Sequence, residues 1–146
     1  MKYTNEIIIN ADRAKVVELF DNPNNMDKWQ PGFISMELVS GESGKPGAKS
    51  KLKYKMGKRE IEMIETITER NLPETFSGTY EAKNVWNDVQ NHFEELPDGK
   101  TKLWAESEFK LSGFMKVMGW LMPGAFKKQS QKYLEYFKEF VEKETV

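Results

Sequence analysis

The sequence of 146 residues contains no cysteine and a single histidine, His92. Without cysteine the chain cannot form a disulfide bond, a thiolate metal site or an iron–sulfur cluster, and it has no cysteine nucleophile. His92 is the one imidazole available for acid–base chemistry, and the residues around it lack the second histidine of a zinc-binding motif. We therefore expect neither a metal nor a cofactor.

The sequence also lacks a large excess of positive or negative charge, and it has no long stretch of apolar residues. The 22 Lys and Arg residues are balanced by 23 Asp and Glu residues, so no strong positive field would attract nucleic acid. No apolar run reaches the ~18 residues that indicate a membrane-spanning helix, and residues 1–6 lack the apolar segment of a secretory signal. The length favours a single domain over residues 1–146. These features predict a cytoplasmic protein without a nucleic-acid partner, and they leave a homodimer open.

The first part of the sequence predicts one strand followed by two short helices. Ile7–Ile9 is β-branched, which favours a strand. Asn10–Asp12 supplies N-cap side chains for a helix whose apolar residues recur at helical spacing as far as Phe20. Pro23 ends that helix, and a second helical turn is expected over Met26–Trp29.

Residues 33–111 change to an apolar period of two, which predicts strands joined by hairpins and therefore an antiparallel sheet. The clearest hairpin is Leu96–Lys100, where we expect a type I turn with a G1 bulge at Gly99. Its register would place Phe93 opposite Leu103 on the inner face of the sheet.

The C-terminal region predicts a long helix, because apolar residues from Phe126 to Val141 recur at spacings of three and four. Pro123 and Gly124 interrupt its start, since proline cannot donate a backbone hydrogen bond. Residues 114–122 are therefore expected to form a separate turn or short helix. They are apolar nearly all round and rich in methionine, so core packing, a cavity wall and an external membrane or partner contact all stay open.

Two side chains are candidates for acid–base chemistry. The hairpin register would place His92 beside Trp104 on the outer face of the sheet, which favours a solvent-facing residue over a catalytic one. Glu65 shares the inner face with Ile61 and Ile67, where an ionised carboxylate needs a partner. With a raised pKa it could act as a general base; the alternatives are an inward polar partner or a bulge that turns it outward.

Five segments form a pattern that spans essentially the whole chain. They are Ile9-Asn10-Ala11, the helix from Val16 to Phe20, Trp29-Gln30-Pro31-Gly32, Asp98-Gly99-Lys100-Thr101 and the ending from Phe126 to Phe140. Together they resemble the START-like superfamily, also called SRPBCC, which includes the birch-pollen allergen and the polyketide cyclase/dehydrase proteins. The resemblance implies an α+β helix-grip fold. In this fold a seven-stranded antiparallel sheet wraps around a long C-terminal helix, with two short helices between strands one and two.

Members of the superfamily bind lipids, sterols, hormones, polyketides or quinones between sheet and helix, and some are aromatase/cyclases. The resemblance implies a cavity lined by inward strand positions and by the long helix. The residues expected to line it are Trp29, Tyr54, Met56, Met63, Phe76, Tyr80, Asn91, Phe93, Phe109, Met118, Met122, Phe126 and Tyr133. No catalytic constellation of the enzyme branches matches this sequence residue by residue.

Three functions follow from these expectations. The leading one is binding of a small hydrophobic or amphipathic ligand, in which apolar burial supplies affinity and a few polar groups fix orientation. The second is a cyclase or dehydratase that uses Glu65 or a cavity tyrosine for proton transfer. The third is a protein-interaction or chaperone-regulating domain, which one apolar patch formed by Trp86, Trp104 or Trp120 would favour.

Overall fold

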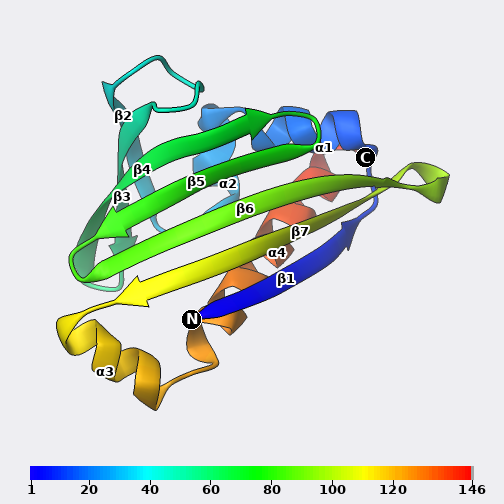
Figure 1. Cartoon of the computed structure of the whole chain (residues 1–146). Helices are drawn as coiled ribbons and strands as arrows, with labels where there is room; N and C mark the ends of the chain where they lie inside the picture. The colour runs from blue at the N-terminus through cyan, green and yellow to red at the C-terminus, as the bar shows by residue number, and fades with distance from the viewer. Residues whose placement is uncertain (146) are drawn as a thin grey trace.

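The computed structural model describes residues 1–145 and contains one antiparallel sheet of seven strands (Figure 1). The strands are β1 (Lys2–Ile9), β2 (Phe33–Ser40), β3 (Lys49–Met56), β4 (Arg59–Asn71), β5 (Thr75–Ala82), β6 (Val85–Leu96) and β7 (Lys100–Leu111). Their order across the sheet is β1-β7-β6-β5-β4-β3-β2. Strands β2 to β7 therefore pair with their neighbours in sequence, and β1 pairs with β7 at one edge. This confirms the predicted sheet.

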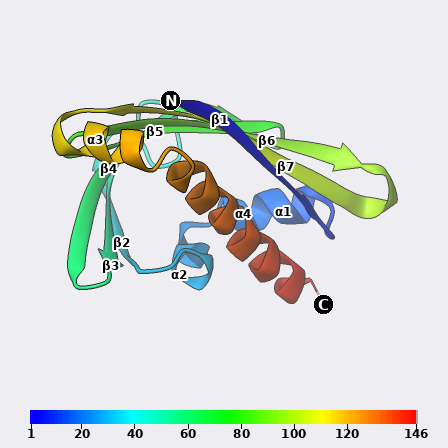
Figure 2. The ribbon, with the colours of Figure 1, turned by 90° about the horizontal axis from the view of Figure 1, so that it is seen from below.

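The helices are α1 (Arg13–Phe20), α2 (Met26–Trp29), α3 (Gly113–Leu121) and α4 (Ala125–Glu144), with a 3-10 turn at Pro23–Asn25. Figure 2 shows α1, α2 and α4 on one side of the sheet, with β2 and β3 curling down toward them. The arrangement is the expected α+β helix-grip fold, with the two short helices α1 and α2 between β1 and β2.

Local capping defines α1. Asp12 occupies the N-cap position, and its carboxylate accepts a hydrogen bond of 2.8 Å from the backbone N–H of Lys15, which satisfies one of the free donors of the first turn. The helix ends at Phe20, and Pro23 then opens the 3-10 turn, where its missing N–H costs nothing. Both boundaries agree with the prediction.

The β6–β7 register is confirmed, since Phe93 pairs with Leu103 and His92 pairs with Trp104. The predicted turn type is wrong. Asp98 has a φ of 68° in addition to the positive φ of the following glycine, whereas a type I turn with a G1 bulge needs a left-handed conformation only at the glycine. Aspartate is one of the few residues besides glycine that tolerate this conformation.

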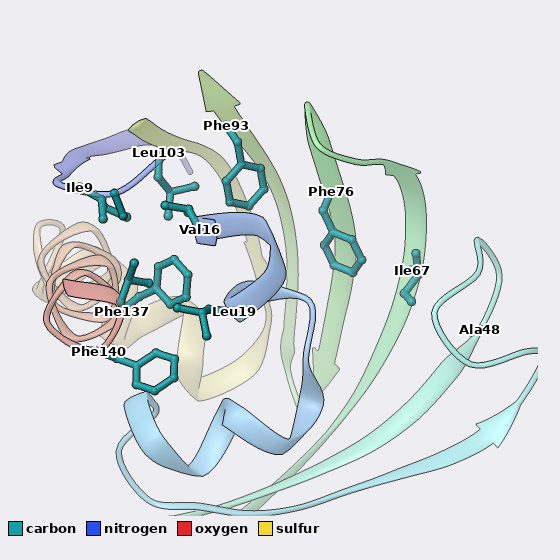
Figure 3. Packing of buried hydrophobic residues seen from close by; sticks show 12 residues of the cluster. Ile9, Val16, Leu19, Ala48, Ile67, Phe76, Phe93, Leu103, Phe137 and Phe140 are labelled. Atoms are coloured by element: carbon teal, nitrogen blue, oxygen red, sulfur yellow. The ribbon is translucent and has the colours of Figure 1, made fainter. Parts of the chain in front are cut away.

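Buried apolar side chains of the sheet, of α1 and of the C-terminal half of α4 pack together in one cluster, which we call the dry core. Figure 3 shows Val16 of α1 between Phe93 of β6 and Phe137 of α4, with Leu19 beside Phe137 on the side of Phe140; all belong to one buried cluster. Phe137 is 1% exposed and meets the ring of Phe20 edge to face at 5.7 Å. The buried residues of α4 all lie from Phe137 onward, so its first three turns belong to a different environment.

Helices α3 and α4 are separate, as predicted from Pro123 and Gly124. Helix α3 approaches the end of β7 at Gly119, where a Cβ atom would lie 2.6 Å from Cδ1 of Leu111. A larger residue at this position would have to displace the Leu111 side chain, so glycine permits the close contact. In Figure 1 α3 lies beyond the end of β7.

Candidate functional site

A cavity of about 540 Å³ lies between the sheet and the part of α4 from Phe126 to Phe137. Most of its wall is apolar and is contributed by inward-facing residues of the strands and by one face of α4. Small-molecule sites in proteins typically occupy roughly 300–1,000 Å³ and are lined mainly by apolar side chains. The size and the lining therefore suit a small apolar guest.

The cavity lies where small side chains occupy inward positions of β3 and β7, the two strands next to the edges of the sheet. Ser50, Ala105 and Ser107 are all buried and line the cavity, and none is long enough to reach α4. In the dry core the corresponding space is filled by the side chains of α1. No α1 side chains lie between α4 and the small strand residues of the cavity wall, so the space between them stays open.

Glu65 provides an acidic group in the cavity wall. It occupies an inward position on β4 and is 8% exposed, and its direct partners across the sheet are Ser50 and Tyr80. Direct cross-strand partners point their side chains to the same face, so the carboxyl and the Tyr80 hydroxyl lie together. Tyr54 lines the same cavity, and its hydroxyl donates a 2.6 Å hydrogen bond to Oε1 of Gln30.

Glu65, Tyr54 and Tyr80 form a cluster in the cavity wall, and its surroundings favour the uncharged forms of these side chains. Burial raises the pKa of the Glu65 carboxyl above its ordinary 4.5, and hydrogen bonding from Tyr80 opposes the shift. Burial also raises the pKa of Tyr80, and the nearby Glu65 charge raises it further. The pKa of Tyr54 is raised by burial first and then by Tyr133 and Glu65. A carboxyl whose pKa is raised in this way is a candidate for proton transfer.

No cation neutralises Glu65 in the part of the chain from residue 1 to 145, because none of its salt bridges includes this carboxyl. Glu65 also faces inward rather than outward. The sequence allowed either an inward polar partner for Glu65 or a bulge that turns it outward. The structure shows the inward partner, which is Tyr80.

Most of the predicted lining residues lie at the cavity wall. Those that the structure places there are Trp29, Tyr54, Met56, Met63, Phe76, Tyr80, Asn91, Phe109, Phe126 and Tyr133, together with Glu65. Their contact with a ligand stays a prediction.

Three predicted lining residues are not at the wall. Phe93 faces inward but is 3% exposed, because the ring of Phe20 lies against it at 5.1 Å and encloses it in the dry core. Met118 belongs to α3, and Met122, just after that helix, is 52% exposed. Both fall outside the cavity because α3 lies beyond the end of β7 rather than beneath the sheet (Figure 1).

A polar end of the cavity was missed by sequence reasoning. Asp21 at the end of α1 and Arg70 on β4 line it, together with Ser43 and Gly44 of the β2–β3 loop. Asp21 and Arg70 are 49 positions apart, and no local pattern links them.

Met36 on β2 and Met56 at the end of β3 also line the cavity and are 37% and 42% exposed, so the cavity reaches the surface.

The outer face of the sheet carries other aromatic groups. The ring of His92 stacks on that of Trp104 at 3.8 Å, and Nζ of Lys110 lies 4.7 Å from the ring centre of Trp86. Trp86 and His92 are separated by about 20 Å along β6, at 3.3 Å per residue, while Trp120 lies on α3. The three tryptophans do not form one apolar patch.

Residues 1–145 contain neither a membrane-spanning helix nor a cluster of metal ligands. No helix in this range is long and apolar enough to cross a bilayer, and no three His, Cys, Asp or Glu side chains come together as a metal site would require.

Solved structures with a similar fold include Ara h 8.0201, at 18% identity and a TM-score of 0.75, with 97% of each chain covered. The Zhui aromatase/cyclase from Streptomyces sp. R1128 gives a TM-score of 0.81 at 10% identity, over 100% of this chain and 96% of its own. Norcoclaurine synthase from Thalictrum flavum, in complex with dopamine and hydroxybenzaldehyde, gives 0.72 at 13% identity, over 98% and 87%. At these identities the similarity shows the fold alone.

No curated protein matches this chain in sequence. The family described as "Polyketide cyclase / dehydrase and lipid transport" matches residues 1–142, which is nearly the whole chain. The fold of that family is of the hydrophobic-ligand-binding or cyclase type, and the observed sheet, helices and cavity agree with it. The chain therefore belongs to the polyketide cyclase/dehydrase and lipid transport family, and its helix-grip fold is the one that the resemblance to the START-like superfamily implies.

Proposed function

We propose that this protein binds a small hydrophobic or amphipathic molecule, such as a lipid, a quinone or a polyketide, in the cavity between the sheet and α4. The observation that carries the proposal is an unfilled volume of about 540 Å³ with a mainly apolar wall. Burial of an apolar ligand there would gain about 25 cal/mol per Å² of surface removed from water. The family description, which names lipid transport, supports the same ligand class.

The cluster of Glu65, Tyr54 and Tyr80 would orient the ligand. The tyrosine hydroxyls can donate hydrogen bonds to a carbonyl or hydroxyl oxygen of the ligand, and the burial that raises the pKa of Glu65 disfavours a second negative charge beside it. A carboxylate ligand beside an ionised Glu65 would be repelled. We therefore expect a preference for neutral oxygen-bearing groups at this point of the cavity.

A cavity-filling substitution tests the proposal. Val89 lines the cavity on β6, while Val39 lies on the edge strand β2 and is 56% exposed. Phenylnaphthylamine, a neutral fluorescent probe, should bind the wild type and Val39→Phe equally. Val89→Phe should lower the affinity at least about tenfold, because a phenyl ring occupies the volume that the probe needs.

The same experiment has a clear negative result. Equal probe binding by Val89→Phe and the wild type, with both folded by circular dichroism, would contradict binding in this cavity. Native mass spectrometry of the purified protein, before and after addition of lipids, quinones and aromatic polyketides, would then identify the class of ligand. A ligand that binds should also raise the melting temperature, since binding to the folded state stabilises it.

A cyclase- or dehydratase-type activity is the second candidate, and the environment of Glu65 favours it. A carboxyl with a raised pKa beside the Tyr80 hydroxyl can transfer a proton, and a cavity that holds a flexible substrate in one conformation supplies the rest of the rate. Glu65→Gln should then abolish turnover of a β-hydroxy ketone while phenylnaphthylamine binding persists. Equal loss of binding and turnover would count against catalysis by Glu65.

A further inference from the structure

Helix α3 presents apolar side chains to the outside. Phe114 is 71% exposed, Val117 49%, Trp120 81% and Leu121 61%. The opposite side of the helix is anchored by Gly119, which is buried against Leu111. In Figure 1 the helix lies beyond the end of β7. Apolar side chains gathered on a surface in this way indicate a contact site.

The segment around α3 has an unusual charge. Residues 109–134 contain five lysines and no acidic residue, whereas the whole chain carries a net charge of −1. The lysines are Lys110, Lys116, Lys127, Lys128 and Lys132. None of the five takes part in a salt bridge within residues 1–145. An exposed apolar helix flanked by unneutralised lysines is complementary to a surface with an apolar interior and negative charge at its boundary.

The same segment forms part of the cavity wall. Phe126, on the first turn of α4, lines the cavity, and its ring lies 4.8 Å from that of Phe109, which also lines it. Phe126 also lies 4.0 Å from where a Cβ on Gly119 would be. The exposed helix and the cavity are therefore separated by about one layer of side chains.

We propose that α3 docks this protein on the surface of an anionic lipid bilayer, with Phe114, Val117, Trp120 and Leu121 in the boundary between headgroups and acyl chains. Short amphipathic helices with aromatic and aliphatic residues on one side and lysines nearby bind membranes in this way, and tryptophan favours that boundary. The bilayer would then be the place where the protein takes up or releases its apolar ligand, which rests on the function proposed above.

A second copy of the chain fits this surface less well. A helix of nine residues is about 14 Å long, whereas a stable interface buries about 800 Å² on each partner. Two copies that met through α3 would also bring their lysine-rich segments together, which like charges oppose. An anionic bilayer avoids both difficulties, because its headgroups neutralise the lysines and its surface adapts to the helix without shape complementarity.

Vesicle co-sedimentation tests the proposal with two matched pairs of variants. One pair is Val117→Ser/Trp120→Ser on α3 and Val39→Ser on β2, all exposed apolar positions. The other is Lys127→Glu/Lys128→Glu and Lys100→Glu, an exposed lysine of the β6–β7 hairpin. The vesicles are phosphatidylcholine alone, or phosphatidylcholine with roughly one third phosphatidylserine.

The wild type should bind the anionic vesicles at least about tenfold more tightly than the neutral ones, and less tightly as salt rises. Each double variant should lower that affinity at least about tenfold, while Val39→Ser and Lys100→Glu leave it unchanged. Unchanged binding by the α3 variant, or no vesicle binding by the wild type, would overturn the proposal. So would a dimer in solution that Val117→Ser/Trp120→Ser dissociates.

Binding of phenylnaphthylamine without vesicles separates this proposal from the proposed function. The α3 and lysine variants should keep the wild-type probe affinity, because none of the substituted residues lines the cavity. Probe binding without vesicle binding would sink the docking proposal alone. Vesicle binding without any probe or ligand binding would sink the cavity function and leave docking in place.

Discussion

The guanidinium of Arg70 donates two hydrogen bonds of 2.6 Å to the carboxylate of Asp21 and so ties the end of α1 to β4. Both side chains are about one third exposed and both line the polar end of the cavity. The pKa of Arg70 is raised, first by this hydrogen bonding. The pair thus bridges one border of the cavity.

Arg70→Gln should speed ligand release more than it lowers stability. A partly exposed ion pair contributes about 1 kcal/mol or less, but its loss would free α1 from β4 at the cavity border. We expect a change in the free energy of unfolding of at most about 1 kcal/mol and a faster dissociation of phenylnaphthylamine in stopped-flow measurements. Lys51→Gln, which removes the pair with Glu62, should leave the rate unchanged, because neither residue lines the cavity. Equal rates in all three proteins would disprove the role of Arg70.

Glu65→Gln should change how stability depends on pH. The folded-state pKa of Glu65 lies above the ordinary 4.5, so its contribution is fully present below about pH 4.5 and is lost as the pH rises through the folded-state pKa. Glutamine cannot ionise. The stability of Glu65→Gln relative to the wild type should therefore increase with pH across this window in urea unfolding. Glu62→Gln, at an exposed position on the same strand, is the control, and a Glu65→Gln curve parallel to the wild type would refute the buried-acid account.

Phe137→Ala should be strongly destabilising. Phe137 is 1% exposed and its ring meets those of Phe20 and Trp29 edge to face, at 5.7 and 5.0 Å. Removing a phenyl ring from such a position costs about 3–5 kcal/mol, which denaturant unfolding would measure. Tyr136→Ala removes the neighbouring ring, which is 38% exposed, and should cost far less. Comparable losses would show that this part of α4 is not the dry core.

His92→Ala and Asn91→Ala should separate the two faces of the sheet. Asn91 lines the cavity, whereas His92 stacks on Trp104 on the outer face. Loss of the stack should cost about 0.5–1.5 kcal/mol of stability and leave phenylnaphthylamine affinity unchanged. Asn91→Ala should change the affinity for phenylnaphthylamine, because it alters the wall of the cavity. A His92→Ala variant with impaired probe binding would show that the outer face contributes to the site.

Much of this fold could be predicted from local patterns. Alternation along β3 and β4 predicts that Tyr54 and Glu65 face inward, while the cavity that both residues line was implied by the resemblance to the START-like superfamily. The side chain of Asp12 and the break at Pro123 define helix ends through the residues next to them. Such features depend on neighbours in sequence or across one hairpin.

The remaining features depend on contacts that no local pattern reports. Phe93 has the parity of a cavity residue, and only the position of Phe20 makes it part of the core. Met118 and Met122 are of a residue type that is common in cavity walls, but the path of α3 places both outside the cavity. The pairing of Asp21 with Arg70 requires the end of α1 to meet β4, which is a consequence of the complete fold.

The division of α4 has a consequence for how proteins of this architecture could diversify. Phe140 and Val141 are buried in the core and do not line the cavity, whereas Tyr133 lines it and Phe137 belongs to both. A substitution at Tyr133 would therefore change the shape of the cavity and leave the contacts of Phe140 and Val141 in place. Related chains can thus vary cavity shape at one set of helix positions and keep the core at another.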